Sequence, residues 1–156
     1  MVRLRLIRRL LRRFGQIGPR RRALVAEAVV VLLAARLALV LIPFPRLARR
    51  LGRFMTPDEA RRLAATPLPQ HARLAADIGW AVTRAARYVP FRAVCLPQAM
   101  AARIMLARRG VASTMHFGAA RGREKLLDAH AWLDAAGVEV TGYPVATGFV
   151  EIACFV

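Results

Sequence analysis

The long apolar segment at residues 23–44 restricts the fold more than any other feature of the chain. Its 22 residues carry only two charges, Glu27 and Arg36, and it ends at Pro43. A helix of this length can cross a bilayer. However, an arginine near its centre would cost roughly 2.5–3.5 kcal/mol on insertion, and flanking basic residues at both ends favour neither orientation. We therefore expect a long helix buried against the rest of the protein, with a membrane-spanning helix as the alternative; the buried helix still allows loose membrane association.

Positive charge is concentrated near the amino terminus. The chain has 26 Lys and Arg residues against 9 Asp and Glu, a net charge of +17; residues 1–54 hold 14 arginines and one acid, or +13. Apolar residues recur at helical spacing among the arginines of residues 3–14, which predicts a basic amphipathic helix. Such a helix could bind an anionic membrane surface, an acidic partner or a leader peptide. The alternative is that its charged face is only solvated. Nucleic acid is not expected because no aromatic side chains interleave with the arginines.

Length and composition allow one domain or a small catalytic domain with a helical extension. Residues 1–54 form the basic and apolar helical region, residues 55–90 a helical linker region, and residues 91–156 the core. Thr56 and Glu59 predict a capping box. A further helix is expected over residues 70–88, with a shared face formed by Leu74, Ile78 and Val82.

Cys95 and His130 have the spacing and surroundings of a cysteine hydrolase. Cys95 precedes a helical stretch in which Pro97 occupies the first turn, Met100, Ile104 and Ala107 share a face, and Gly110 ends the helix. A helix N-terminus favours the thiolate, which is the nucleophilic form. His130 follows 35 residues later in a strand-like stretch and can act as general base and then general acid.

Neither of the other two histidines has neighbours that suggest chemistry, and the second cysteine is expected in the core. His71 is in a helical stretch, His116 is in a predicted strand, and Cys154 is in an apolar terminal run typical of a protein core. Because the two cysteines are far apart, no CxxC motif or zinc-finger spacing is present. The sequence therefore predicts no metal and no cofactor.

Several stretches, taken in order, resemble the B proteins of lasso-peptide biosynthesis, a microcin-processing family of transglutaminase-like cysteine peptidases that remove leader peptides. They are Cys95-Leu96-Pro97-Gln98-Ala99-Met100-Ala101-Ala102, Leu106-Ala107-Arg108-Arg109-Gly110-Val111, Phe117-Gly118, Ala129-His130-Ala131-Trp132-Leu133 and Val140-Thr141-Gly142. The region upstream of the core also resembles this family. The resemblance implies an α+β fold with a papain/transglutaminase-like core, in which the Cys95 helix packs on an antiparallel sheet of residues 113–119, 129–134, 138–141 and 149–155.

The resemblance also implies the site. Cys95 is the expected nucleophile, His130 its proton-transfer partner, and the Cys95 backbone amide the first oxyanion donor. These enzymes orient the histidine with an aspartate about a dozen residues downstream, where this chain has no carboxylate. Asp134 lies on the histidine's own strand, roughly 13 Å away. Glu139, Thr141 or a backbone carbonyl remain as candidates to hold the ring.

The expected function is cleavage of a ribosomally made lasso-peptide precursor between leader and core. The expected partners are the precursor leader, a separate leader-recognition protein and an ATP-using lasso cyclase, and the expected location is cytoplasmic with peripheral membrane contact as an option. Acyl transfer to an amine uses the same acyl-enzyme and is not distinguished by sequence. The alternative from another class is a membrane-associated, non-enzymatic interaction protein that uses residues 1–54.

Overall fold

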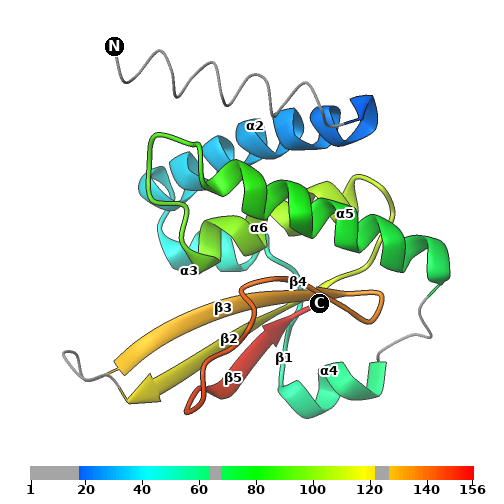
Figure 1. Cartoon of the computed structure of the whole chain (residues 1–156). Coiled ribbons are helices and arrows are strands. Elements are labelled where there is room, and N and C mark those ends of the chain that lie inside the picture. Colours follow the sequence, from blue (N-terminus) through cyan, green and yellow to red (C-terminus); the bar gives the residue numbers. More distant parts are fainter. Residues whose placement is uncertain (1–17, 64–67, 122–126) are drawn as a thin grey trace.

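The computed structural model describes residues 18–63, 68–121 and 127–156. Within them, a layer of helices covers one side of a five-stranded antiparallel sheet (Figure 1). The layer contains α2 (Pro19–Leu41), α3 (Phe44–Ala48), α5 (Pro69–Ala86) and α6 (Cys95–Ala107), whereas α4 (Pro57–Leu63) lies on the other side. The α+β fold with an antiparallel sheet and an N-terminal helix is therefore confirmed. The basic helix predicted over residues 3–14 lies outside the described residues.

The strand order in the sheet is β1-β5-β2-β3-β4. The strands are β1 (Phe54–Met55), β2 (Thr114–Arg121), β3 (Leu127–Ala135), β4 (Val138–Thr141) and β5 (Val150–Phe155). The four longer strands match the predicted ones to within two residues at each end, and β1 was not foreseen. Its two residues pair with the C-terminal strand β5, so the segment after α3 extends the sheet.

The apolar segment forms α2, which buries only one of its faces. That face packs on α5 and α6 through Leu24, Val25, Ala28, Val31, Leu32 and Ala35. Glu27 is held by Arg109 at the end of α6, with distances of 2.5 and 3.1 Å, while Arg36 is exposed. The helix is long and apolar enough to cross a membrane, and 33% of its most apolar window is buried. The expected burial is therefore confirmed for one face and wrong for the other.

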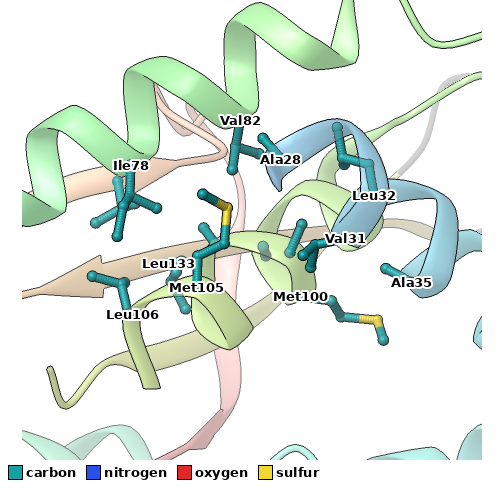
Figure 2. Close-up of a cluster of buried hydrophobic side chains, with 14 of the residues drawn as sticks. Ala28, Val31, Leu32, Ala35, Ile78, Val82, Met100, Met105, Leu106 and Leu133 are labelled. Carbon is teal, nitrogen blue, oxygen red and sulfur yellow. The ribbon is translucent and has the colours of Figure 1, made fainter. Parts of the chain in front are cut away.

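The hydrophobic core lies between α2, α5, α6 and the sheet (Figure 2). Leu32 from α2, Ile78 and Val82 from α5, Met105 from α6 and Leu133 from β3 are completely buried. Ile78 and Val82 confirm the predicted face of α5. On α6, Met100 is buried as expected, but Ile104 and Ala107 are exposed, because Ala102, Met105 and Leu106 face the core instead. One core thus joins all three regions distinguished in the sequence.

Local signals explain several boundaries. The capping box before α4 is confirmed, because the Glu59 carboxylate accepts the Thr56 N–H at 2.8 Å while the Glu59 N–H reaches the Thr56 hydroxyl at 3.4 Å. Gly110 follows α6 with φ of +69°, a conformation that ends helices. The β3–β4 hairpin turns at Ala136 and Gly137, both at positive φ, as expected for a two-residue turn.

Two bulges decide which side chains share a face of the sheet. On β4, Thr141 pairs with Leu133 and Glu139 with Asp134, so Val140 is the extra residue. On β5, Ala153 pairs with Phe117 and Glu151 with Gly118, so Ile152 is the extra residue. Because side chains alternate along a strand, each bulge reverses the faces of the residues beyond it.

Candidate active site

Cys95 is the first residue of α6 and is half-buried. The first hydrogen bond of the helix runs from the Gln98 N–H to the Val94 carbonyl, and Pro97 has no N–H to offer. The N–H groups of Cys95 and Leu96 therefore have no acceptor within the helix and can donate to an anion beside the thiol. The Gln98 side chain donates instead to the Ala93 carbonyl at 2.6 Å, so it caps the preceding loop.

His130 lies on β3, and its ring is close to those of Trp132 and Phe149. The ring centroids are 5.9 Å and 5.5 Å from that of His130, respectively. His130 Nε2 lies 2.7 Å from the carbonyl oxygen of Gly142. A carbonyl only accepts hydrogen bonds, so this contact requires the proton on Nε2 and leaves the lone pair on Nδ1. The tautomer is the one that a general base acting through Nδ1 needs.

Of the three candidates from sequence, which were Glu139, Thr141 and a backbone carbonyl, the group that contacts the His130 ring is a carbonyl, that of Gly142. Glu139 is exposed beside the hairpin turn, opposite Asp134, as its position predicts. Thr141 is buried on the helical side of the sheet, and its hydroxyl has no hydrogen-bond partner among the described residues. Asp134 accepts from the Tyr143 hydroxyl and does not contact His130.

Gly142 can approach β3 closely because it has no side chain. Its φ is +85°, and a Cβ built there would lie 2.5 Å from the Ala131 carbonyl oxygen and 2.8 Å from Trp132 Cα. The main chain at this position therefore lies against β3. This close approach brings the Gly142 carbonyl to His130.

Cys95 and His130 come from elements that are in contact, since α6 packs against both β3 and β4. Across the described ranges, no hydrogen bond joins the Cys95 thiol to the His130 ring. His130 also shares a face of β3 with Trp132, whereas Leu133 on the other face meets the helices. The catalytic pairing of these two residues accordingly stays a prediction.

A second group of titratable side chains, not foreseen from sequence, lies on the face of the sheet opposite α6. His116 Nδ1 is 2.5 Å from Glu151 Oε1, and the Cys154 thiol donates to the same oxygen at 2.8 Å. Cys154 is fully buried, as expected of a core cysteine. The expectation that His116 has no chemically suggestive neighbours is wrong, because strand pairing supplies neighbours that are distant in sequence.

Burial and charge shift the pKa values in this group. Burial raises the pKa of Cys154 to about 12, and the adjacent Glu151 carboxylate acts in the same direction. Burial lowers the pKa of His116, but the hydrogen bonds and charges of Asp134 and Glu151 outweigh it, so the net shift is upward. Burial and the Asp134 carboxylate also raise the pKa of Tyr143. In the absence of another ligand, Cys154 is therefore a thiol and not a nucleophile.

A cysteine that begins a helix packed on an antiparallel sheet, with a histidine on the contacted strand, defines a cysteine-peptidase-type fold. Residues 38–154 match the transglutaminase-like superfamily, and because the match covers most of the chain, the protein belongs to that superfamily. The superfamily includes cysteine peptidases and transferases. No curated protein and no solved structure matches the chain.

Proposed function

We propose that the protein is a cysteine peptidase that removes the leader from a lasso-peptide precursor, with Cys95 as nucleophile and His130 as general base. The observation that carries the proposal is the His130 ring itself. Its Nε2–H donates to the Gly142 carbonyl at 2.7 Å, so the lone pair on Nδ1 is available to accept a proton. The start of α6 supplies the second element, a half-buried cysteine whose own N–H and that of Leu96 have no acceptor within the helix.

The reaction would proceed through an acyl-enzyme. Proton transfer from the Cys95 thiol to His130 Nδ1 gives the thiolate, which attacks the carbonyl carbon at the leader–core junction. The N–H groups of Cys95 and Leu96 are suited to stabilise the resulting oxyanion. The imidazolium then protonates the departing amine, which is the new amino terminus of the core, and water hydrolyses the thioester.

The carbonyl that holds His130 has a chemical consequence for this mechanism. A carboxylate in that position would stabilise the imidazolium by charge, whereas the neutral Gly142 carbonyl offers only a hydrogen bond. The carbonyl still fixes the tautomer and the ring orientation. We therefore expect a less stabilised imidazolium, and a slower chemical step, than in relatives with an aspartate.

The partners follow from the same proposal. A separate leader-recognition protein would present the precursor, and an ATP-using cyclase would consume the freed amino terminus. The +13 charge of residues 1–54 supports an acidic docking partner or leader.

The test is mass spectrometry of a precursor encoded beside this gene, incubated with the protein and its recognition partner. We expect cleavage at one leader–core junction, loss of cleavage in Cys95→Ala and in His130→Ala, and no change in His71→Ala, a half-buried histidine on α5. An intact precursor with folded wild-type protein and a competent partner contradicts the proposal. Cleavage that persists in Cys95→Ala also contradicts it.

The pairing of Cys95 with His130 has a test that needs no substrate. If His130 accepts the Cys95 proton, alkylation of Cys95 by iodoacetamide at neutral pH will be faster in the wild type than in His130→Gln. Equal alkylation rates in the two proteins would show that His130 does not activate Cys95.

A second candidate function, membrane association, is supported by the outer face of α2. Val30 is 66% exposed, Leu37 50% and Leu41 75%, and the helix is flanked by arginines on both sides. An apolar stripe bordered by basic residues suits an anionic bilayer surface. We expect sedimentation with phosphatidylglycerol vesicles that is weakened by Leu37→Glu but not by Leu127→Glu, a leucine on β3 that is 67% exposed. Equal weakening by both variants would exclude α2 as the contact.

A further inference from the structure

Three different metal-ligating atoms converge on the sheet face opposite α6. They belong to His116 on β2 and to Glu151 and Cys154 on β5, and they all lie within 4.8 Å of one another. The Cys154 Sγ–His116 Nδ1 distance is 3.6 Å. Cys154 is completely buried, and the side chains of His116 and Glu151 are 14% and 23% exposed. The group is therefore enclosed rather than spread over the surface.

Strand pairing and a bulge assemble this group. Cys154 lies directly opposite His116 in the β2–β5 pairing, so their side chains share a face. Regular alternation would turn Glu151 to the other face, but the extra residue at Ile152 returns it to the side of Cys154. The ring of Trp132 stacks on that of His116 with an interplanar angle of 6°, which restricts the imidazole. Rigid strands thus hold all three donors.

We propose that His116, Glu151 and Cys154 form a binding site for a zinc ion. A nitrogen, an oxygen and a sulfur donor match the ligand set that Zn²⁺ accepts. With Zn–S of about 2.3 Å and Zn–N of about 2.0–2.1 Å, a tetrahedral ion separates the two atoms by about 3.6 Å. The observed Sγ–Nδ1 distance already has this value.

The carboxylate is the part of the site that has to adjust. Glu151 Oε1 lies 2.5 Å from Nδ1 and 2.8 Å from Sγ, whereas ligands of one tetrahedral ion lie about 3.4–3.6 Å apart. The Glu151 side chain must therefore withdraw by less than about 1 Å. It is the most exposed of the three, and its other oxygen already lies 3.9 Å from Arg61 on α4.

The surroundings of His116 resemble the outer shell of a metal site. Its second nitrogen, Nε2, is buried and lies 3.3 Å from Asp134 Oδ2, within ion-pair range but poorly aligned for a hydrogen bond. Asp134 is itself held by the Tyr143 hydroxyl. A ligating histidine commonly donates its other N–H to a carboxylate, which fixes the tautomer and raises the basicity of the ligand. A small ring rotation would complete this bond.

Zinc binding needs no other reactant, because the protons released and the charges can all be accounted for. The Cys154 thiol proton leaves to solvent, and the proton that His116 Nδ1 donates to Glu151 also leaves that nitrogen, so His116 binds through Nδ1 as a neutral ring with its proton on Nε2. The thiolate and the Glu151 carboxylate offset the charge of the ion. The ion would link β5 to β2 on the side away from α6. The site therefore has a role in holding the C-terminal strand in the sheet and does not depend on the proposed peptidase activity.

The test uses the full chain after treatment with a chelator. Calorimetric titration with ZnCl₂ should give one equivalent per chain, and CoCl₂ should give a thiolate-to-cobalt charge-transfer band. Cys154→Ser and His116→Gln should each weaken zinc binding by more than about 100-fold, and Asp134→Asn by about 10-fold. Cys95→Ala is the matched control and should bind as wild type does.

Three results would overturn the proposal. They are the absence of saturable zinc binding by the folded wild-type chain, binding that survives in Cys154→Ser, or loss of the charge-transfer band in Cys95→Ala. Circular dichroism separates loss of the site from loss of the fold. If Cys154→Ser does not fold, the wild-type melting temperature decides the matter, since zinc must raise it and an inert hydrogen-bonded group must leave it unchanged.

Discussion

Replacement of Gly142 by alanine should destabilise the protein far more than the same replacement at Gly110. Both glycines have positive φ, +85° and +69°, which costs a residue with a side chain roughly 1–2 kcal/mol. A Cβ at Gly110 would meet nothing within 4 Å. At Gly142 it would lie 2.5 Å from the Ala131 carbonyl oxygen, which belongs to the backbone and cannot rotate away.

The additional cost at Gly142 follows from that contact. Relieving it requires β4 to move away from β3, and overpacking of this kind costs typically 1–3 kcal/mol. We therefore expect Gly142→Ala to lose about 2–5 kcal/mol of unfolding free energy and Gly110→Ala about 1–2 kcal/mol. For a chain of this size the larger loss lowers the melting temperature by roughly 5–15 °C.

Chemical denaturation of both variants, followed by circular dichroism, measures the difference directly. If the two losses agree to within about 0.5 kcal/mol, the close approach of Gly142 to β3 does not constrain the fold and the reasoning is wrong. A leader-cleavage assay on Gly142→Ala adds a second readout. Under the proposed function, activity should fall further than the folded fraction does, because the carbonyl that orients His130 moves.

Three other perturbations have expected outcomes. Iodoacetamide at pH 8 should label Cys95 in the native protein and not Cys154, whose pKa of about 12 and complete burial leave almost no reactive thiolate; labelling of both before unfolding would contradict this. The arginine beside Glu27 holds the pKa of that carboxyl below its usual value, so the ion pair should stabilise the fold above about pH 4.5 and be lost as pH falls through the lower native pKa. Acid titration should thus find Glu27→Gln less sensitive to pH than wild type, and an unchanged profile would refute the assignment. Leu32→Ala should cost about 2–5 kcal/mol, whereas Leu37→Ala, at a half-exposed site on the same helix, should stay within about 0.5 kcal/mol in denaturant melts.

Local chemistry made most of the fold predictable. Thr56 and Glu59 form reciprocal hydrogen bonds within one turn, and Gly110 ends α6 by adopting a positive φ. Both features depend only on residues that are neighbours along the chain. The four longer strands were expected from the family resemblance, and the structure has them within two residues at each end. The buried face of a helix was harder to predict. Ile104 was expected in the core but is exposed, because an apolar helix such as α6 has no polar side to fix its rotation.

The candidate site residues also differ in whether their neighbours along the chain reveal them. Cys95 and His130 are recognisable because each carries its signal in adjacent residues, a helix start and a strand. The group that surrounds His116 has no such signal, since it depends on Cys154 pairing with His116 and on the bulge at Ile152. A shift of one residue in that register would send Glu151 to the other face.

By itself, the sequence determined where helices and strands begin, which cysteine starts a helix, and that α2 had to cover apolar surface. Only the tertiary structure decided that α2 leaves one face exposed, that a Gly142 carbonyl contacts His130, and that His116, Glu151 and Cys154 meet. The physical reason is the range of the interactions. Capping and periodicity act within a few residues, whereas strand register, bulges and backbone approach are set by packing between segments that are distant along the chain.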